Sequence, residues 1–189
     1  GYKALAKLAD ELRGEVAPLL KKAPAAVTLP QLWQLARWFI ILFYSKHALR
    51  GDLGDVRITK KGQNYIEKKS GSWHIHVGQH KTVRAHGAIE LKLHPDVSKA
   101  LDRYLPYVRA KTKHGYLLST KRYGNKMTRK DMMQLIRNTT KSRLGKNIGI
   151  QLIRVLKTTE HFKSIDESAQ LRGELAHGPQ MQWKYVSRT

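Results

Sequence analysis

The sequence predicts a mainly helical α+β fold with a small antiparallel sheet at one edge. Apolar residues recur at helical spacing in the first 50 residues and again after Pro95. Between these two parts lie three short segments with the composition of strands, at residues 65–68, 73–77 and 88–93. The chain of 189 residues can bury a full core, and its 41% of hydrophobic residues is typical of a folded domain.

The first helix is expected at residues 2–21, where leucines and a valine recur every three or four positions. These residues are Leu5, Leu8, Leu12, Val16, Leu19 and Leu20. Residues 24–30 form a linker in this prediction. Thr28 can cap the next helix and Pro30 suits its first turn, so a core helix should begin here and end near Gly51.

The loop at residues 78–87 is expected to join the last two strands as a basic hairpin tip. Lys81 and Arg84 lie within it. His74 and His76 share one face of the preceding strand. The chain has no cysteine and no carboxylate pair nearby, so we expect solvent-facing histidines here rather than a metal site.

Capping signals and apolar spacing predict the helices of the second half. One helix should follow Pro95, with Val97, Leu101, Tyr104 and Leu105 on its apolar face. Thr128 and Asp131 form a capping box before the next helix. A further helix is expected at residues 149–162, and Ser164 is a capping residue that can start another.

The charge of the chain predicts a polyanionic partner. The formal net charge is +22, from 36 Lys and Arg residues against 14 Asp and Glu residues. Nucleic acid is the polyanion we expect first, and an anionic membrane surface second. The longest apolar run, residues 38–44, is far too short to span a membrane, and no secretory signal opens the sequence. The absence of cysteine excludes disulfide and thiolate chemistry and fits an intracellular protein.

A set of five residues has the chemistry needed to cleave a phosphodiester: Arg50, Lys81, Arg154, His177 and Tyr185. Covalent cleavage needs a nucleophile, a clamp on the non-bridging oxygens and a proton donor for the leaving oxygen. Arginine suits the clamp because its guanidinium fork matches phosphate oxygens. A lysine can protonate the leaving oxygen, and a tyrosine phenolate can attack phosphorus. The chain lacks the carboxylate clusters of a two-metal nuclease, so neither a metal nor a cofactor is expected.

These residues lie in segments that resemble the boxes of tyrosine recombinases, the phage-type integrases, in the family's order. The segments are residues 48–53 around Arg50, the hairpin tip with Lys81, residues 150–154, residues 175–178 around His177, and Tyr185. The residues of these segments resemble most closely those of recombinases from large DNA viruses, virophages and eukaryotic mobile elements. The resemblance implies the helical catalytic domain shared with type IB topoisomerases. It also implies site-specific DNA recombination or integration through a 3′-phosphotyrosyl intermediate on Tyr185, without metal or ATP.

The sequence departs from the family in several places. Gln151 stands where the family has a histidine, and a glutamine can hydrogen-bond the phosphate or the tyrosine but cannot usefully take a proton. The acidic residue after the first arginine is Asp52, two positions on. His177 and Tyr185 are eight residues apart, where many bacterial members have nine. These departures leave the identity of the general base open.

The resemblance also implies a domain division and a set of partners. Residues 1–27 would be an N-terminal helix and linker, and residues 28–189 the catalytic domain. The family's N-terminal DNA-clamping domain is expected to be absent and its C-terminal segment cut short. The partner would be double-stranded DNA, bound by a homotetramer in the full-length protein or by a monomer of this domain. The expected DNA contacts are Lys60, Lys61, His80, Arg84, Lys126, Arg129 and Lys146.

Other interpretations remain open. Taken singly, Arg50 could be a cation at a helix C-terminus and Lys81 a solvated lysine. The chain could also be a type IB topoisomerase-like enzyme, or a DNA-binding module on the same scaffold whose activity is weakened by Gln151. A basic nucleic-acid-binding protein without an active site would leave the ordered segments unexplained.

Overall fold

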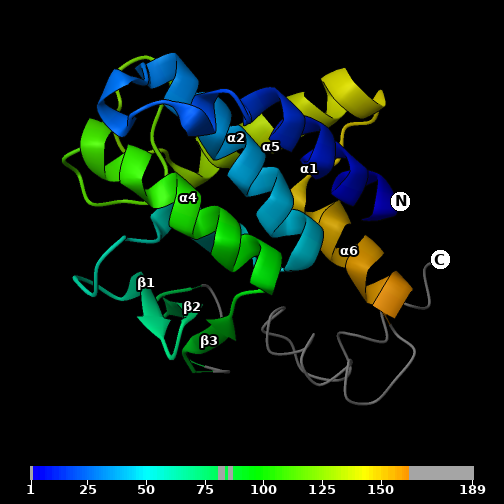
Figure 1. Ribbon diagram of the computed structural model, residues 1–189. Helices are drawn as coiled ribbons and strands as arrows, with labels where there is room; N and C mark the ends of the chain where they lie inside the picture. Colours follow the sequence, from blue (N-terminus) through cyan, green and yellow to red (C-terminus); the bar gives the residue numbers. More distant parts are fainter. Residues whose placement is uncertain (1, 81–83, 85–86, 162–189) are drawn as a thin grey trace.

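Helix α2, Leu29–Lys46, is the central helix of the fold. A computed structural model describes residues 2–80, 84 and 87–161. In this part of the chain α2 packs against α1, Tyr2–Val16, against α4, Pro95–Lys111, and against α5, Arg129–Leu144. Figure 1 shows the helices grouped together with the sheet at one edge of them. The described part is therefore α+β and mainly helical with a three-stranded antiparallel sheet, as the sequence predicts.

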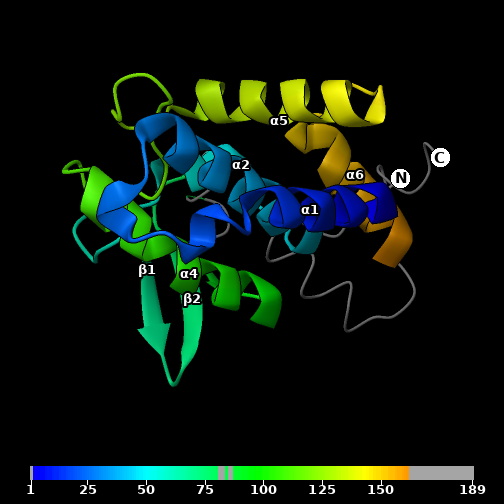
Figure 2. The same ribbon diagram turned by 45° about the horizontal axis from the view of Figure 1, so that its top comes forward.

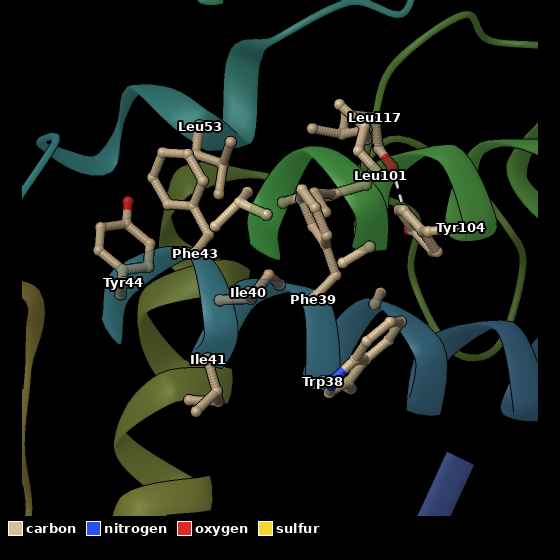
Figure 3. Close-up of a cluster of buried hydrophobic side chains, with 14 of the residues drawn as sticks. Trp38, Phe39, Ile40, Ile41, Phe43, Tyr44, Leu53, Leu101, Tyr104 and Leu117 are labelled. Carbon is tan, nitrogen blue, oxygen red and sulfur yellow. Dashed lines mark hydrogen bonds between the residues drawn. The ribbon is translucent and has the colours of Figure 1, made fainter. Parts of the chain in front are cut away.

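The core explains why α2 lies in the centre. Its buried residues lie on every side of the helix, and a helix that is apolar all round must be covered all round. Figure 3 shows Phe39 and Phe43 pointing toward Leu53 and Leu101, which come from other parts of the chain. Phe39 stacks on Tyr104 of α4 with ring centroids 5.2 Å apart.

The N-terminal helix is shorter than predicted. α1 ends at Val16, and residues Leu19–Lys21 form a separate 3-10 turn. Pro18 causes this break because it has no N–H to donate to the carbonyl of Gly14, which instead accepts a bond from Ala17 at 3.4 Å. Within the predicted linker, Pro24–Ala26 form another 3-10 turn.

Helix α2 begins as predicted but ends earlier. Thr28 caps it, and the side chain of Gln31 bonds back to Thr28 to complete a capping box. The helix ends at Lys46 rather than near Gly51, because His47 turns into an extended conformation. The buried ring of His47 accepts a hydrogen bond from the backbone N–H of His94 at 3.0 Å. This bond to a distant residue holds the chain away from the helical path.

The sheet consists of β1, Asn64–Lys69, β2, Ser72–Val77, and β3, Ile89–Lys92. Both neighbouring pairs are antiparallel, and Ile75 in the middle strand is opposite Ile66 and Leu91. The sheet meets the helices through contacts between β2 and α4. These strands confirm the three predicted segments to within a residue or two at each end.

The last helices bring distant segments next to the end of α2. α5 begins at the predicted capping box of Thr128 and Asp131 and ends at Gly145, which is left-handed with φ 65°. Figure 2 shows α5 lying across one side of the helical group. α6, Ile150–His161, follows and contacts α1. The helix predicted from Ser164 lies outside the described residues.

Candidate active site

Arg50 lies on the extended segment between α2 and the 3-10 turn η3, Gly51–Asp55. The hydroxyl of Tyr44, in the last turns of α2, donates a hydrogen bond to the carbonyl oxygen of Arg50 at 2.9 Å. Tyr44 is fully buried, and burial raises the pKa of its phenol well above the ordinary value. The phenol therefore remains a neutral donor that fixes the backbone of Arg50.

Asp52 is a buried carboxylate next to Arg50. One of its oxygens pairs with Nη2 of Arg129 at 2.6 Å, while the other is buried with no hydrogen bond to any described group. Burial raises the pKa of Asp52, and the charges of Arg129, His80 and Arg50 act in the opposite direction. Three basic side chains from three segments of the chain are therefore close to one carboxylate.

Arg154 of α6 reaches the same place. Its side chain is buried, with only 4% exposed, and its Nη1 donates to Oε1 of Gln151 at 3.2 Å. Besides burial, three charges act on the phenol of Tyr44: Asp52 raises its pKa, whereas Arg154 and Arg129 lower it. Arg50 and Arg154 are about 100 residues apart in the sequence, yet both are neighbours of the Tyr44–Asp52 pair.

Helix α6 is fastened to the end of α2. The ammonium group of Lys157 donates a hydrogen bond to the carbonyl of Lys46, in the last turn of α2. The hydroxyl of the next residue, the buried Thr158, donates to the carbonyl of Arg154 at 2.9 Å, one turn back in α6. The bond from Lys157 holds α6, which carries Arg154, next to the end of α2.

The base of the predicted hairpin tip also lies here. His80 is 6% exposed, and its Nε2 lies 2.8 Å from the carbonyl oxygen of Gly87. This hydrogen bond ties the two ends of the loop together beside Asp52. Lys81, at the tip, lies outside the described residues, as do His177 and Tyr185. The structure thus brings together Arg50, Gln151 and Arg154 of the six predicted catalytic residues.

The predicted DNA contacts fall into two groups. Lys126 and Arg129 are held by Asp55, at 2.7 Å and 2.5 Å, and Lys60 pairs with Glu67. His80 is buried, as described above. Lys60 is exposed although it is paired, and the second group, Lys61, Arg84 and Lys146, is also exposed to solvent. The second group can meet a ligand directly, whereas the paired lysines and arginine are fixed in direction by carboxylates.

Most tyrosines in the described part of the chain, which does not include Tyr185, are poor candidates for a nucleophile beside these arginines. Tyr44, Tyr104 and Tyr107 are buried and donate their hydroxyl hydrogens to backbone carbonyls. Tyr65 stacks on His76, and Tyr123 is 67% exposed. Tyr116 differs, because Arg57 and Lys126 both lie against its ring, at 4.4 Å and 4.3 Å from the ring centroid.

A hollow of about 710 Å³ adjoins this cluster, and the sequence did not predict it. His80 and Arg129 line it and also act on Asp52, so it is continuous with the arginine cluster. Arg57 and Tyr116 line it as well. Neither residue stands in a recognisable motif, because their proximity arises from backbone bonds between Val56 or Ile58 and residues 115–117.

The arrangement suits an anionic tetrahedral group more than a cation. Arg50 lowers the pKa of Asp52, and Asp52 and Arg154 act in opposite directions on the pKa of Tyr44, so these four residues lie in one neighbourhood. Guanidinium groups are well suited to bind phosphate oxygens. Within the described ranges, no group of three or more His, Asp or Glu side chains could hold a metal ion.

Two further observations bear on the partner and the family. Among the helices of the described residues, none is both long enough and apolar enough to cross a membrane. A scan of protein-family models found no match to the chain, and a search of curated proteins also found none.

Proposed function

We propose that the chain cleaves and rejoins DNA strands as a tyrosine recombinase, through a 3′-phosphotyrosyl intermediate on Tyr185. The observation that carries this proposal is the meeting of Arg50 and Arg154 at the Tyr44–Asp52 pair. These are the two arginines that the sequence singles out as a phosphate clamp. Two residues so far apart in a chain with 36 Lys and Arg would seldom meet at one buried pair by chance.

In the proposed reaction, the phenolate oxygen of Tyr185 attacks the phosphorus of the scissile phosphodiester. The bond between phosphorus and the 5′ oxygen breaks, and Lys81 gives a proton to the leaving 5′ oxygen. Arg50 and Arg154 stabilise the charge on the non-bridging oxygens, with His177 as a further donor. Attack of a 5′ hydroxyl on the phosphotyrosyl bond reverses the steps and reseals the strand, so no ATP is needed.

Gln151 takes a different part from the family's histidine in this proposal. Its amide oxygen accepts a hydrogen bond from Arg154, so it orients the guanidinium group. A glutamine does not titrate, and the proton of Tyr185 must therefore pass to water or to another side chain.

A nicked duplex that traps the covalent intermediate is the direct test. The short strand released by cleavage diffuses away, so the wild-type protein should accumulate a protein–DNA adduct that survives denaturation. Tyr185→Phe should form no adduct while binding the same duplex with nearly unchanged affinity, because the lost oxygen is the nucleophile. Tyr123→Phe, at a 67% exposed tyrosine that lines no part of the hollow beside the arginine cluster, is the matched control and should form the adduct at the wild-type rate. An adduct formed by Tyr185→Phe would sink the assignment.

The hydrogen bond between Gln151 and Arg154 also favours a second candidate, a DNA-binding module with weakened or no cleavage. In that case the wild-type protein would bind duplex DNA but form no adduct on the nicked substrate. A type IB topoisomerase-like enzyme would form the adduct and relax supercoiled plasmid as a monomer. A recombinase would instead exchange strands between two sites in a complex of four protomers.

A further inference from the structure

The hollow beside the arginine cluster holds an arginine that forms no ion pair with any described residue. Its walls come from η3, the turn before β1, the start of the hairpin loop, the segment around Tyr116 and the start of α5. The residues that matter here are Asp55, Arg57, Asn64, Tyr116, Lys126 and Arg129. Three of these are cations and one is a carboxylate, so the hollow favours an anion.

The backbone and side chain of Arg57 are held firmly. Its N–H donates to the carbonyl of Asn64 and its carbonyl accepts from the N–H of Ile66, both at 2.9 Å. Its guanidinium carbon lies 4.4 Å from the centroid of the Tyr116 ring. Gly62, with φ +115°, passes close by, and a Cβ at this position would lie 3.2 Å from Cδ of Arg57. The direction of the guanidinium group is therefore set before any ligand arrives.

No described residue supplies an acceptor for this guanidinium group. Its Nε is buried and makes no hydrogen bond, and none of the ion pairs among the described residues includes Arg57. The neighbouring cations differ, because Asp55 pairs with both Lys126 and Arg129. An anion that enters the hollow would balance the charge of this guanidinium group.

Phosphate is the anion that this geometry matches best. A guanidinium fork can donate two parallel hydrogen bonds to two oxygens of one phosphate. Lys126 supplies a second positive charge, because its ammonium group also lies at the Tyr116 ring, 4.3 Å from the centroid. A carboxylate could bind the guanidinium fork equally well, but the position of the hollow favours a phosphate over a carboxylate. His80 and Arg129 line the hollow, and both also act on Asp52, as Arg50 does. The hollow therefore lies next to the proposed site of the cleaved phosphate.

We propose that the hollow binds a backbone phosphate of the DNA duplex next to the one that is cleaved, with Arg57 as its bidentate ligand. This proposal rests on the function proposed above, because it takes the scissile phosphate to lie at Arg50 and Arg154. In this role Arg57 is a positioning residue. It fixes the register of the strand on the enzyme without touching the reacting atoms.

The test replaces one DNA phosphate at a time by an uncharged methylphosphonate, on either side of the cleavage position. Wild-type protein should lose about tenfold in affinity, or about 1.4 kcal/mol, at one or two positions, because an uncharged phosphate analogue weakens the bonds from the guanidinium group. Arg57→Gln should bind unmodified DNA about tenfold more weakly and should show no further loss at those positions. Arg57→Lys retains the charge without the fork and should fall between them.

Arg109→Gln is the matched control, because Arg109 is an exposed arginine of α4 that lines no part of the hollow. It should retain every methylphosphonate effect of the wild type. Circular dichroism and thermal unfolding of each variant separate a loss of the phosphate contact from a loss of the fold. If folded Arg57→Gln keeps all of the wild-type losses, the hollow does not bind a backbone phosphate.

A second arm separates failure of this inference from failure of the proposed function. Thermal unfolding is measured in inorganic phosphate and in sodium chloride of equal ionic strength. If the wild type binds no DNA but is stabilised by phosphate, and Arg57→Gln is not, the hollow is an anion site whose ligand is not DNA. That outcome overturns both the duplex as ligand and the proposed function. If neither DNA nor phosphate binds, both proposals are wrong and the anion site is excluded as well.

Discussion

Arg50 and Arg154 are held in place by different means. Arg50 is positioned through its backbone, because the hydroxyl of Tyr44 bonds its carbonyl oxygen. Arg154 is positioned through its side chain, which is buried and bonded to Gln151. The sequence identified both arginines but placed Arg50 at a helix end. The extended segment there depends on bonds from Tyr44 and His47 that local sequence does not reveal.

Removing either arginine should abolish most cleavage. Arg50→Ala and Arg154→Ala should each lower the rate of adduct formation by about 10²-fold or more, because each removes a preorganised donor to the developing charge. Lysine at either position should restore little, because it lacks the guanidinium fork. The control is Arg109→Ala, on the exposed side of α4, which should cleave normally. Near-normal cleavage by Arg154→Ala would show that residues 150–154 are not part of the site.

Tyr44→Phe tests whether the position of Arg50 matters. The change deletes one hydrogen bond at 2.9 Å, and it should lower the free energy of unfolding by about 1 kcal/mol. It should also lower the rate of adduct formation by about tenfold, since small displacements of a catalytic group are costly.

Tyr104→Phe is the matched control for Tyr44→Phe. Tyr104 is equally buried and donates to the carbonyl of Leu117 at 3.0 Å, as the dashed line in Figure 3 shows. This variant should lose a similar amount of stability with no effect on cleavage beyond it. Equal rate losses in the two variants would mean that the Tyr44 bond supports only the fold.

Gln151→His would introduce the histidine that the family has at this position, and it should change the pH dependence of cleavage. An imidazole at this position titrates near pH 6.5, so the rate should acquire a midpoint in that region. The measurement is adduct formation between about pH 5.5 and 8 in the wild type and the variant. Gln134→His, at an exposed position of α5, controls for an added histidine elsewhere. Identical profiles in wild type and Gln151→His would place residue 151 away from the reacting groups.

At the scale of elements, local signals predicted where helices begin better than where they end. Both capping boxes, Thr28 with Gln31 and Thr128 with Asp131, are present. A cap works through residues three apart, so it is visible in the sequence. The end of α2 depends instead on a hydrogen bond from His94, which is 47 residues away. No local pattern reports such a bond.

The same limit applies to the site. The ion pairs of Asp55 with Lys126 and Arg129 join residues 71 and 74 positions apart, and the sequence suggested only that the two cations bind DNA. The structure shows that these pairs fasten η3 to the start of α5. Arg57 was missed altogether, because its significance arises from a missing acceptor rather than from a motif.

Asp55 should make the junction of η3 and α5 sensitive to acid. Burial alone would raise the pKa of Asp55, but hydrogen bonds from Lys126 and Arg129 hold it below the ordinary value. A carboxyl group with a lowered pKa in the folded state contributes stability above its unfolded pKa of about 3.9. This contribution is lost as the pH falls through the lower, folded-state pKa.

The variant that tests this junction is Asp55→Asn. It should lower the free energy of unfolding at pH 7 by about 1–2 kcal/mol, a range reduced for partial exposure of the pairs. In urea titrations between about pH 5 and 2, its stability should fall less steeply than that of the wild type. Asp10→Asn is the control, because Asp10 forms an exposed pair with Arg13 at 3.5 Å. Parallel pH profiles for wild type and Asp55→Asn would exclude Asp55 as the acid-sensitive group.

At the scale of the molecule, the position of α2 links the core to the site. Its middle is buried among the helices shown in Figure 1, while its last turn carries Tyr44 and accepts the bond from Lys157 of α6. The extended segment after α2 then carries Arg50. The same helix that organises the core therefore anchors both segments that carry the two arginines. The proposed phosphate clamp would be positioned by these anchors rather than by long flexible loops.

The overall charge of +22 predicts that DNA binding will weaken steeply with salt. If Arg50, Arg154 and about three of the exposed or hairpin cations neutralise phosphates, the counterions of about five phosphates are released from the DNA. The logarithm of the binding constant should then fall against the logarithm of salt concentration with a slope of about −4.5. Affinity should drop by about 500-fold between 50 and 200 mM salt. Duplex binding measured over this range gives the slope, and Arg57→Gln should make it shallower by about one.

Vesicles of anionic lipid serve as the competing polyanion, because a basic surface alone would bind them as well. Tight vesicle binding together with a flat salt dependence on DNA would favour the membrane surface over the duplex as partner.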